Sequence, residues 1–317
     1  MKKYFFIALL FVTGQITLFS QNSESIKRDS LLIVSLQKKL PGLRDTARIN
    51  CMNEIAKAFL NVTITPGRWD LFKNKIDSGH MYVDIAYRES MQIGYKYGIA
   101  QSLMTFLNVC NMYYTYNRKK RIDNGPNWKK SEEYQKQLFD LASQMNDAEI
   151  WGMTYSFQSD VLAHKNNRRE DVIGALKNSL TWFKKAGDEK RESNVCTYVG
   201  WLFCSNGEYE KGFEYCNRGL QLAKKINKNA DPDDESNEMV QEGLEDMSGI
   251  YKAAGDYETA LDFLRESRQF HATHNASNTG GMEAALADMF LQAGQYDSCF
   301  YYLKAQLASR DLYDQLT

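Results

Sequence analysis

Apolar residues recur at helical spacing along most of this chain. Leu244, Met247 and Tyr251 stand three and four positions apart, and Leu261 and Leu264 continue the spacing after a short break. This spacing places apolar side chains on one face of an α-helix. No segment shows a sustained alternation of apolar and polar residues, which would indicate strands. The pattern therefore predicts an all-α protein built from antiparallel pairs of amphipathic helices.

Three short strings repeat within this helical pattern. Residues 207–212, 255–260 and 294–299 each read Gly-x-Tyr-x-x-small. At identical offsets before each glycine stand an aromatic residue and, three positions earlier, a small one: Phe203 and Gly200, Tyr251 and Ser248, Phe290 and Ala287. A small residue lets two helices approach closely, and Gly supplies the unusual φ of a tight turn between them. Each string therefore predicts a helical hairpin.

These hairpins resemble the tetratricopeptide repeat, in which small residues stand where helix A crosses helix B, an aromatic residue ends helix A and a glycine forms the turn. Residues 251–261 match closely, and the resemblance covers about 45–311. The chain departs from the family in its period, since the three aromatic residues are 48 and 39 positions apart instead of about 34. The closing Pro is missing, and residues 148–185 fit poorly because Gln158 or Asp160 falls at an expected core site.

The resemblance implies a right-handed α-solenoid of about six antiparallel hairpins over 45–317, each burying its apolar face against its neighbours. Residues 21–44 are predicted as a polar lead-in or capping helix, with helix over 30–40. The predicted hairpins are 45–61 with 78–95, 98–116 with 128–145, 148–165 with 170–185, 189–205 with 208–225, 236–254 with 257–272, and 278–293 with 296–311. Segments 45–50, 141–147 and 222–227 also look like the long-period repeats in exported sensor regions of bacterial signalling proteins.

The amino terminus has the pattern of an export signal. Lys2 and Lys3 precede an apolar run of nine residues from Tyr4 to Val12. This run is too short to span a membrane, which needs about 20 apolar residues, and it has the length of the apolar part of a secretory signal. We predict that residues 1–20 are a signal peptide and that the protein is exported to the periplasm or cell envelope. The alternative is an uncleaved amino-terminal anchor.

Charge and loop composition narrow the range of partners. The 317 residues include 39 Lys and Arg and 40 Asp and Glu, and this balance argues against a general nucleic-acid binder. Segment 118–130 carries six basic residues and Trp128, and segment 231–238 carries five acids; both are predicted as loops between helices. Residues 65–69 are predicted to interrupt the first hairpin with Trp69. Loops of this length are often functional.

No constellation of catalytic or metal-binding residues is evident. His271 and His274 share a helix end without further ligands nearby, so they are interpreted as a solvated helix terminus. The six Cys form no C-x-x-C, and we predict that they are mostly unpaired and buried at helix contacts. Cys196 and Cys216 lie in one predicted hairpin and are the one pair that could form a disulfide. The phosphate-binding, dinucleotide-binding and nucleophile-elbow motifs are missing. The sequence therefore predicts neither an enzyme nor a cofactor.

The resemblance to the tetratricopeptide repeat implies a scaffold that binds a protein or peptide along the concave surface of its A helices, with a membrane signalling protein as a further candidate partner. The residues that fall at lining positions are Leu107, Asn111, Tyr114, Asn194, Thr197, Trp201, Glu242, Glu245 and Lys252. Trp201 and Tyr114 would supply contact area, and the polar groups would set orientation. Two other classes stay open: the periplasmic sensing part of a two-component-type system whose output module is separate, and an enzyme.

Overall fold

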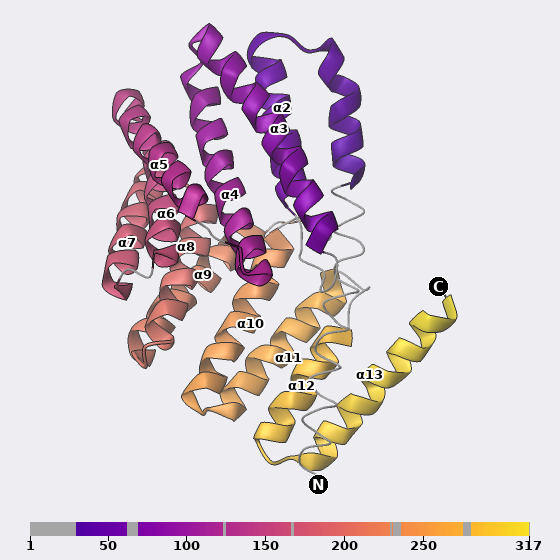
Figure 1. Ribbon diagram of the computed structural model, residues 1–317. Helices are drawn as coiled ribbons and strands as arrows, with labels where there is room; N and C mark the ends of the chain where they lie inside the picture. The colour runs from indigo at the N-terminus through magenta and orange to yellow at the C-terminus, as the bar shows by residue number, and fades with distance from the viewer. Residues whose placement is uncertain are drawn as a thin grey trace. The chain divides into compact units, whose positions relative to one another are not determined.

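The described part of the chain is helical throughout. In the computed structural model, residues 30–61, 69–122, 125–165, 168–228, 230, 236–274 and 280–316 are described (Figure 1). After a helix over residues 30–39, the elements in order are η1 Leu40–Gly42, α2 Asp45–Leu60, α3 Trp69–Ile93, α4 Lys96–Lys120, α5 Gly125–Met145, α6 Ala148–His164, α7 Arg169–Ala186, α8 Glu189–Cys204, α9 Tyr209–Asn227, α10 Ser236–Ala254, α11 Tyr257–His274, α12 Gly280–Gln292 and α13 Tyr296–Leu316. None of these helices has both the length and the apolar character needed to cross a membrane.

The six predicted hairpins are confirmed as the pairs α2/α3, α4/α5, α6/α7, α8/α9, α10/α11 and α12/α13, whose members pack against each other. Several helices are longer than predicted, among them α3, α4 and α13. Helix α3 begins at Trp69 instead of residue 78, and α13 continues to Leu316 instead of ending at residue 311. The helix over residues 30–39 also agrees with the prediction for the lead-in. The predicted signal peptide, residues 1–20, lies outside the described residues.

Segment 118–130 was predicted as a loop, and this prediction is wrong for most of its length. Helix α4 continues through Lys120, and α5 begins at Gly125. Arg and Lys are good helix formers, and their charges are favourable in the last turn of a helix, where α4 carries three of them. The acidic segment 231–238 was also predicted as a loop, but its last three residues, 236–238, form the start of α10. Residues 231–235, and residues 65–68 of the predicted interruption, lie outside the described residues.

The chain divides into two compact units, which we call the N-terminal unit, residues 22–186, and the C-terminal unit, residues 187–317. In the N-terminal unit, each helix from α2 to α7 packs against the next. In the C-terminal unit, the same holds from α8 to α13. Each unit thus contains three hairpins that bury their apolar faces against one another, as a repeat architecture requires.

The repeated strings have the roles that their spacing predicts. Their glycines, Gly207, Gly255 and Gly294, all have positive φ, at 79°, 86° and 73°. This left-handed conformation costs other residues energy and reverses the chain between the two helices of each hairpin. Two of the aromatic residues before these turns, Phe203 and Phe290, are buried. The string therefore encodes both the turn and the packing beside it.

Helices α8 and α9 cross at very short distance. A Cβ atom added at Gly200 would stand 2.2 Å from Sγ of Cys216, and one added at Gly212 would stand 2.0 Å from Sγ of Cys204. Each thiol therefore fills the space that a glycine leaves on the other helix. This arrangement explains why small residues stand at both positions of the repeated string.

All six cysteines are buried and free, as predicted, and Cys196 and Cys216 form no bridge. Burial raises the pKa of Cys110 to about 11 and that of Cys216 to about 12. Because the thiolate is the reactive form, these thiols are poor nucleophiles at neutral pH. They act as small apolar side chains in the core.

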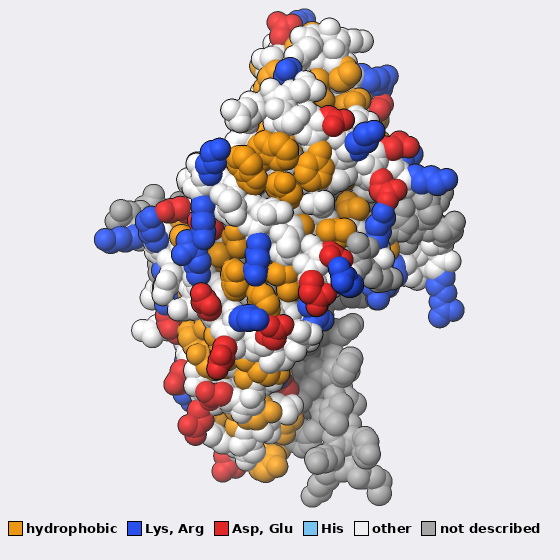
Figure 2. All heavy atoms as spheres, turned by 90° about the vertical axis from the view of Figure 1, so that its left-hand side faces the viewer, with side chains coloured by type: hydrophobic (Ala, Val, Ile, Leu, Met, Phe, Trp, Pro, Cys, Tyr) orange, Lys and Arg blue, Asp and Glu red, His pale blue; other side chains and the backbone are white. Residues whose placement is uncertain are grey.

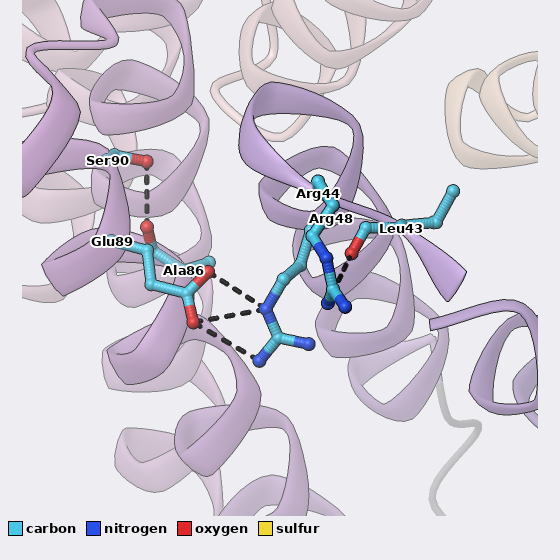
Figure 3. Close-up of polar contacts among 6 residues, drawn as sticks. All are labelled: Leu43, Arg44, Arg48, Ala86, Glu89 and Ser90. Carbon is cyan, nitrogen blue, oxygen red and sulfur yellow. Dashed lines mark hydrogen bonds and ion pairs between the residues drawn. The ribbon is translucent and has the colours of Figure 1, made fainter. Parts of the chain in front are cut away.

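Polar contacts also join the first hairpin. The Arg48 guanidinium on α2 binds the Glu89 carboxylate on α3 through Nε and Nη2, at 3.1 to 3.2 Å (Figure 3). One residue further along α3, the Ser90 hydroxyl donates to the Ala86 carbonyl at 2.7 Å and is fully buried. A bidentate Arg–carboxylate pair fixes the orientation of both side chains. The pair therefore holds the amino-terminal half of α2 on α3.

Candidate functional site

The A helices, the first of each hairpin, contact one another directly within each unit. These are α2, α4 and α6 in the N-terminal unit and α8, α10 and α12 in the C-terminal unit. Side chains form polar links between neighbouring A helices: Ser102 to Asn53, Asn111 to Asp160, Trp201 to Asp246, and Lys252 to Asp288. Polar side chains therefore link neighbouring A helices in both units, along the face that the A helices of each unit share.

A hollow of about 510 Å³ opens on this face in the N-terminal unit. It is bordered by the helix over residues 30–39, by α2 with its carboxyl end, and by α4. Its lining combines four apolar residues, three amides and two charged residues: Leu32, Ala58, Leu60, Met112, Asn61, Asn108, Asn111, Glu54 and Lys57. Glu54 and Lys57 pair with each other at 2.9 Å. The hollow thus offers apolar surface and hydrogen-bonding groups side by side.

The structure separates the three predicted lining residues of α4. Asn111 lines the hollow, and its Nδ2 donates to Oδ2 of Asp160 on α6 at 3.3 Å. The Tyr114 ring packs 4.3 Å from the His164 ring of α6. Leu107 is only 1% exposed and belongs to the core between α4, α5 and α6, because its side chain points to the B helix rather than outward. Asn111 is therefore the predicted residue that the hollow contains.

The predicted residues of α8 also point in different directions. Asn194 is exposed. Thr197 faces α9, since its hydroxyl would stand 2.6 Å from a Cβ atom at Gly219. Trp201 lies across α10: its Nε1 donates to Oδ1 of Asp246 at 2.9 Å, and its ring edge would touch a Cβ atom at Gly249 at 3.0 Å. Trp201 thus packs on the next A helix while part of its surface stays accessible.

On α10, the predicted residues Glu242 and Glu245 stand near further acidic side chains, whereas Lys252 is a cation. Glu242 is exposed, yet neighbouring side chains crowd its carboxylate, and this partial burial raises its pKa, with the negative charge of Asp246 adding to the shift. Glu245 accepts hydrogen bonds from Gln241 and from Ser267 of α11. Lys252 forms an ion pair with Asp288 of α12. Two of the three are therefore engaged within the protein.

The strongest electrostatic perturbation on this face is at Asp160. Burial raises the pKa of its carboxyl to about 6, and the hydrogen bond from Asn111 lowers it only in part. One turn further along α6, burial also lowers the pKa of His164, and the positive charge of Arg118 lowers it further. Both side chains are half-buried. At neutral pH, this region therefore combines an ionised but poorly solvated carboxylate with a neutral imidazole.

Several residues of the site were missed from the sequence. Leu32 could not be placed, because the position of the capping helix against α2 and α4 depends on tertiary packing. Asn108 and Met112 stand one position after Leu107 and Asn111, which were predicted to line the binding surface, and a small error in helix register moves such residues between faces. Asp160 did give a signal, since it is a charged residue at an expected core position.

Metal ligation finds no support among the described residues, which contain no group of three or more His, Cys, Asp or Glu able to hold an ion. His271 was interpreted as part of a solvated helix terminus, but its side chain is 7% exposed, and burial lowers its pKa. The side chains of His274 and Trp128 lie outside the described residues.

A second surface feature is aromatic. Phe139, Trp151, Tyr155 and Trp182 join α5, α6 and α7, with Trp151 and Trp182 stacked at 5.5 Å between ring centroids. The Lys185 ammonium lies 4.6 Å from the Trp182 centroid. Apolar side chains reach the surface among charged ones on the side of the molecule where these helices lie (Figure 2). Because the rings stack mainly on one another, the column serves the packing of its own helices.

The comparisons with known proteins agree on the fold. No protein-family model matches the chain, and no curated protein matches it. Among solved structures, BtubC from P. vanneervenii is 13% identical with a TM-score of 0.60, over 76% of this chain and 92% of that one. A signal transduction ATPase with numerous domains and a tetratricopeptide repeat sensor, from Pyrococcus horikoshii, is 15% identical with a TM-score of 0.51, over 92% of this chain and 47% of that one.

A third similar structure is a Rap protein complexed with competence and sporulation factor. It is 13% identical with a TM-score of 0.51, over 95% of this chain and 77% of that one. Identities this low establish a common fold and nothing finer. The chain therefore has the tetratricopeptide-like fold of sequential antiparallel helical hairpins, an all-α architecture of the solenoid class.

Proposed function

We propose that this chain is an exported, non-catalytic binding protein that holds a peptide, or an extended segment of a partner protein, against the A-helix face of its N-terminal unit. The observation that carries the proposal is the hollow of about 510 Å³ between the helix over residues 30–39, α2 and α4. Its volume lies within the range of about 300–1,000 Å³ that is typical of ligand sites.

The chemistry of the hollow suits a peptide. Asn61, Asn108 and Asn111 present amides, which can donate to a backbone carbonyl and accept from a backbone N–H at the same time. Leu32 and Met112 offer apolar contact for side chains. Methionine adapts its shape to different ligands, so it tolerates a range of peptide side chains.

The similar structures support a binding role. One is a Rap protein in complex with a competence and sporulation factor, and another contains a tetratricopeptide repeat sensor. The predicted signal peptide at residues 1–20 supports export, and an envelope fraction would then contain the protein without those residues. Mass spectrometry that finds the intact amino terminus in the membrane would instead favour the uncleaved anchor.

A peptide selection tests the proposal directly. The purified protein would be used to select from a displayed library of random short peptides, and the affinities of selected peptides would be measured by calorimetry. Asn108→Ala removes an exposed amide from the hollow and should weaken binding by at least about tenfold, corresponding to ~1.4 kcal/mol. Asn178→Ala is the matched control, because it removes an exposed amide from the B helix α7. Equal affinities for both variants would place binding elsewhere.

A second candidate function is the sensing part of a two-component-type signalling system with a separate output module. The tetratricopeptide repeat sensor among the similar structures favours it. In that case, a membrane signalling protein should bind the ligand-loaded and ligand-free forms with different affinities. A tightly bound cofactor in the purified protein would favour the enzyme class instead.

A further inference from the structure

Asp160 is an ionisable side chain on the A-helix face that forms no ion pair with another described residue. It lies on α6, where it faces α4, and among the described residues its hydrogen-bond donor is the neutral amide of Asn111. That bond is 3.3 Å long, beyond the usual range of N–H···O bonds to a carboxylate. Moving a carboxylate out of water costs free energy unless a cation or several donors replace the water.

Three other aspartates receive a cation from the protein. In the N-terminal unit, Lys73 pairs with Asp77 at 2.6 Å, and Arg88 pairs with Asp84 at 2.6 Å. Between the A helices of the C-terminal unit, Lys252 pairs with Asp288. Accordingly, Lys73 helps to lower the pKa of Asp77, whereas the pKa of Asp160 is raised. Among the described links between A helices, Asp160 and Asp246 both accept from a neutral donor, Asn111 and Trp201 respectively, and burial raises the pKa of both carboxyls. Asp160 differs in that its donor, Asn111, also lines the hollow.

Asn111 connects this carboxylate to the hollow. The same side chain lines the hollow and donates to Asp160, so the carboxylate lies directly behind a lining residue, on the α6 side of the hollow. Asp160 keeps part of its surface accessible. His164 follows Asp160 by one turn on α6, and it contacts the Tyr114 ring and feels the charge of Arg118, both on α4. Arg118 acts on His164, and the contributions to the pKa of Asp160 are its burial and the Asn111 bond.

We infer that Asp160 is the recognition site for a positively charged group of the ligand, so that the bound peptide carries a cation beside the segment that occupies the hollow. This inference rests on the proposed function and names the class of peptide: one with Lys, Arg or a free amino terminus at the position that meets α6. The cation supplies the ionic partner that Asp160 does not have among the described residues, and Asn111 orients the carboxylate toward it.

The test uses the random-peptide selection, run in parallel on the unaltered protein, on Asp160→Asn and on Asp140→Asn. Asp140 lies on the exposed face of α5, so its replacement removes the same charge away from the site. The unaltered protein and Asp140→Asn should enrich peptides with a cationic group at one position. Asp160→Asn should lose that enrichment and bind the selected peptides roughly thirtyfold or more weakly, as expected when one partner of a buried charge pair is removed.

Two further comparisons separate the sources of the cation. Acetylating the peptide amino terminus, or replacing its Lys or Arg by Gln, identifies the group that meets Asp160, because that change weakens binding to the unaltered protein and has little effect on Asp160→Asn. Asp160→Glu keeps the charge and should retain part of the affinity. This result would show that the loss in Asp160→Asn comes from the missing charge and not from a folding defect.

The outcomes distinguish this inference from the function on which it rests. Selection of no peptide contradicts the proposed function itself. Selection of peptides without a cationic preference, or with a preference that Asp160→Asn leaves intact, overturns the role of Asp160 while peptide binding stands.

Discussion

Replacing Gly152 by Ala tests the packing of the third hairpin against a matched site in the same hairpin. Gly152 lies on α6, where an added Cβ would stand 2.5 Å from both Cδ1 and Cε1 of Phe183 on α7. Phe183 is only 1% exposed, so its ring cannot swing into solvent. Gly174 lies on α7 in the same hairpin, is exposed, and has no atom within 4 Å of an added Cβ.

Two effects change the free energy of unfolding: helix propensity, which acts in both variants, and overpacking, which acts in only one. Ala is favoured over Gly in a helix interior by about 0.8–1 kcal/mol, and both variants gain this amount. Overpacking a core costs about 1–3 kcal/mol, and only Gly152→Ala incurs this cost. A contact of 2.5 Å is far inside ordinary van der Waals distance, so we expect the upper half of that range. Gly174→Ala should therefore raise the free energy of unfolding by about 0.5–1 kcal/mol, and Gly152→Ala should lower it by about 1–2 kcal/mol.

Denaturant unfolding measures both effects, followed by far-UV circular dichroism and by tryptophan fluorescence. Trp151 and Trp182 are stacked within the same hairpin, so the fluorescence reports on its unfolding. The double variant Gly152→Ala, Phe183→Leu should recover part of the loss, because the two side chains are in contact. Equal shifts for Gly152→Ala and Gly174→Ala would refute the assigned helix faces, since then no contact distinguishes the two glycines.

Three further predictions concern the C-terminal unit and the thiols. Ala260→Leu should lower the free energy of unfolding by about 1–3 kcal/mol, because Ala260 is fully buried and its carbonyl accepts from Ser248 at 2.7 Å; an unchanged midpoint would contradict this packing. Thiol titration should find six free thiols after denaturation and slow reaction before it, since burial raises the pKa of Cys216 to about 12; fast reaction of the native protein would contradict the burial. Trp201→Ala should lower the free energy of unfolding by about 3 kcal/mol, because the substitution removes a ring that packs on α10 and the hydrogen-bond donor of Asp246. A loss of partner binding at an unchanged free energy of unfolding would instead identify Trp201 as a binding residue.

The repeated string predicted the hairpins of the C-terminal unit because each of its residues has one local role. Gly255 sets the turn through its positive φ of 86°, and Ala260 gives the close crossing. The long α3 was missed at its start because Trp69 follows a Pro-Gly pair, which is a turn signal in any sequence. The basic segment was predicted as a loop because it lies between the predicted helices 98–116 and 128–145, although Lys and Arg favour the last turn of a helix and α4 continues into it.

The candidate site was harder to predict, because lining residues depend on which helix faces stay uncovered. Helical spacing placed Asn111 correctly beside the hollow but also placed Leu107 there, one turn away, where α5 and α6 cover it. The spacing of one helix cannot tell how far its neighbours extend over its sides. Asp160 was visible as an unexpected polar residue, and its environment follows only from the approach of α4 to α6.

The raised pKa of Asp160 also predicts how the free energy of unfolding depends on pH. Its pKa is raised from 3.8 to about 6, so the folded state holds this proton more tightly than the unfolded state does. Between about pH 4 and pH 6 the folded state therefore binds more protons, and the contribution of Asp160 to stability falls as pH rises through this window. Asn cannot ionise, so Asp160→Asn escapes this loss.

The stability advantage of Asp160→Asn over the unaltered protein should therefore grow with pH, by about 2–3 kcal/mol between pH 4 and pH 7, because a tenfold difference in proton affinity between the folded and unfolded states corresponds to about 1.4 kcal/mol. Denaturant unfolding at several pH values measures it, with Asp140→Asn as the control for net charge. An advantage that is constant across this range would show that the carboxylate is well solvated or already paired. The folded state would then not disfavour the ionised carboxylate, and there would be no physical reason for Asp160 to bind an external cation.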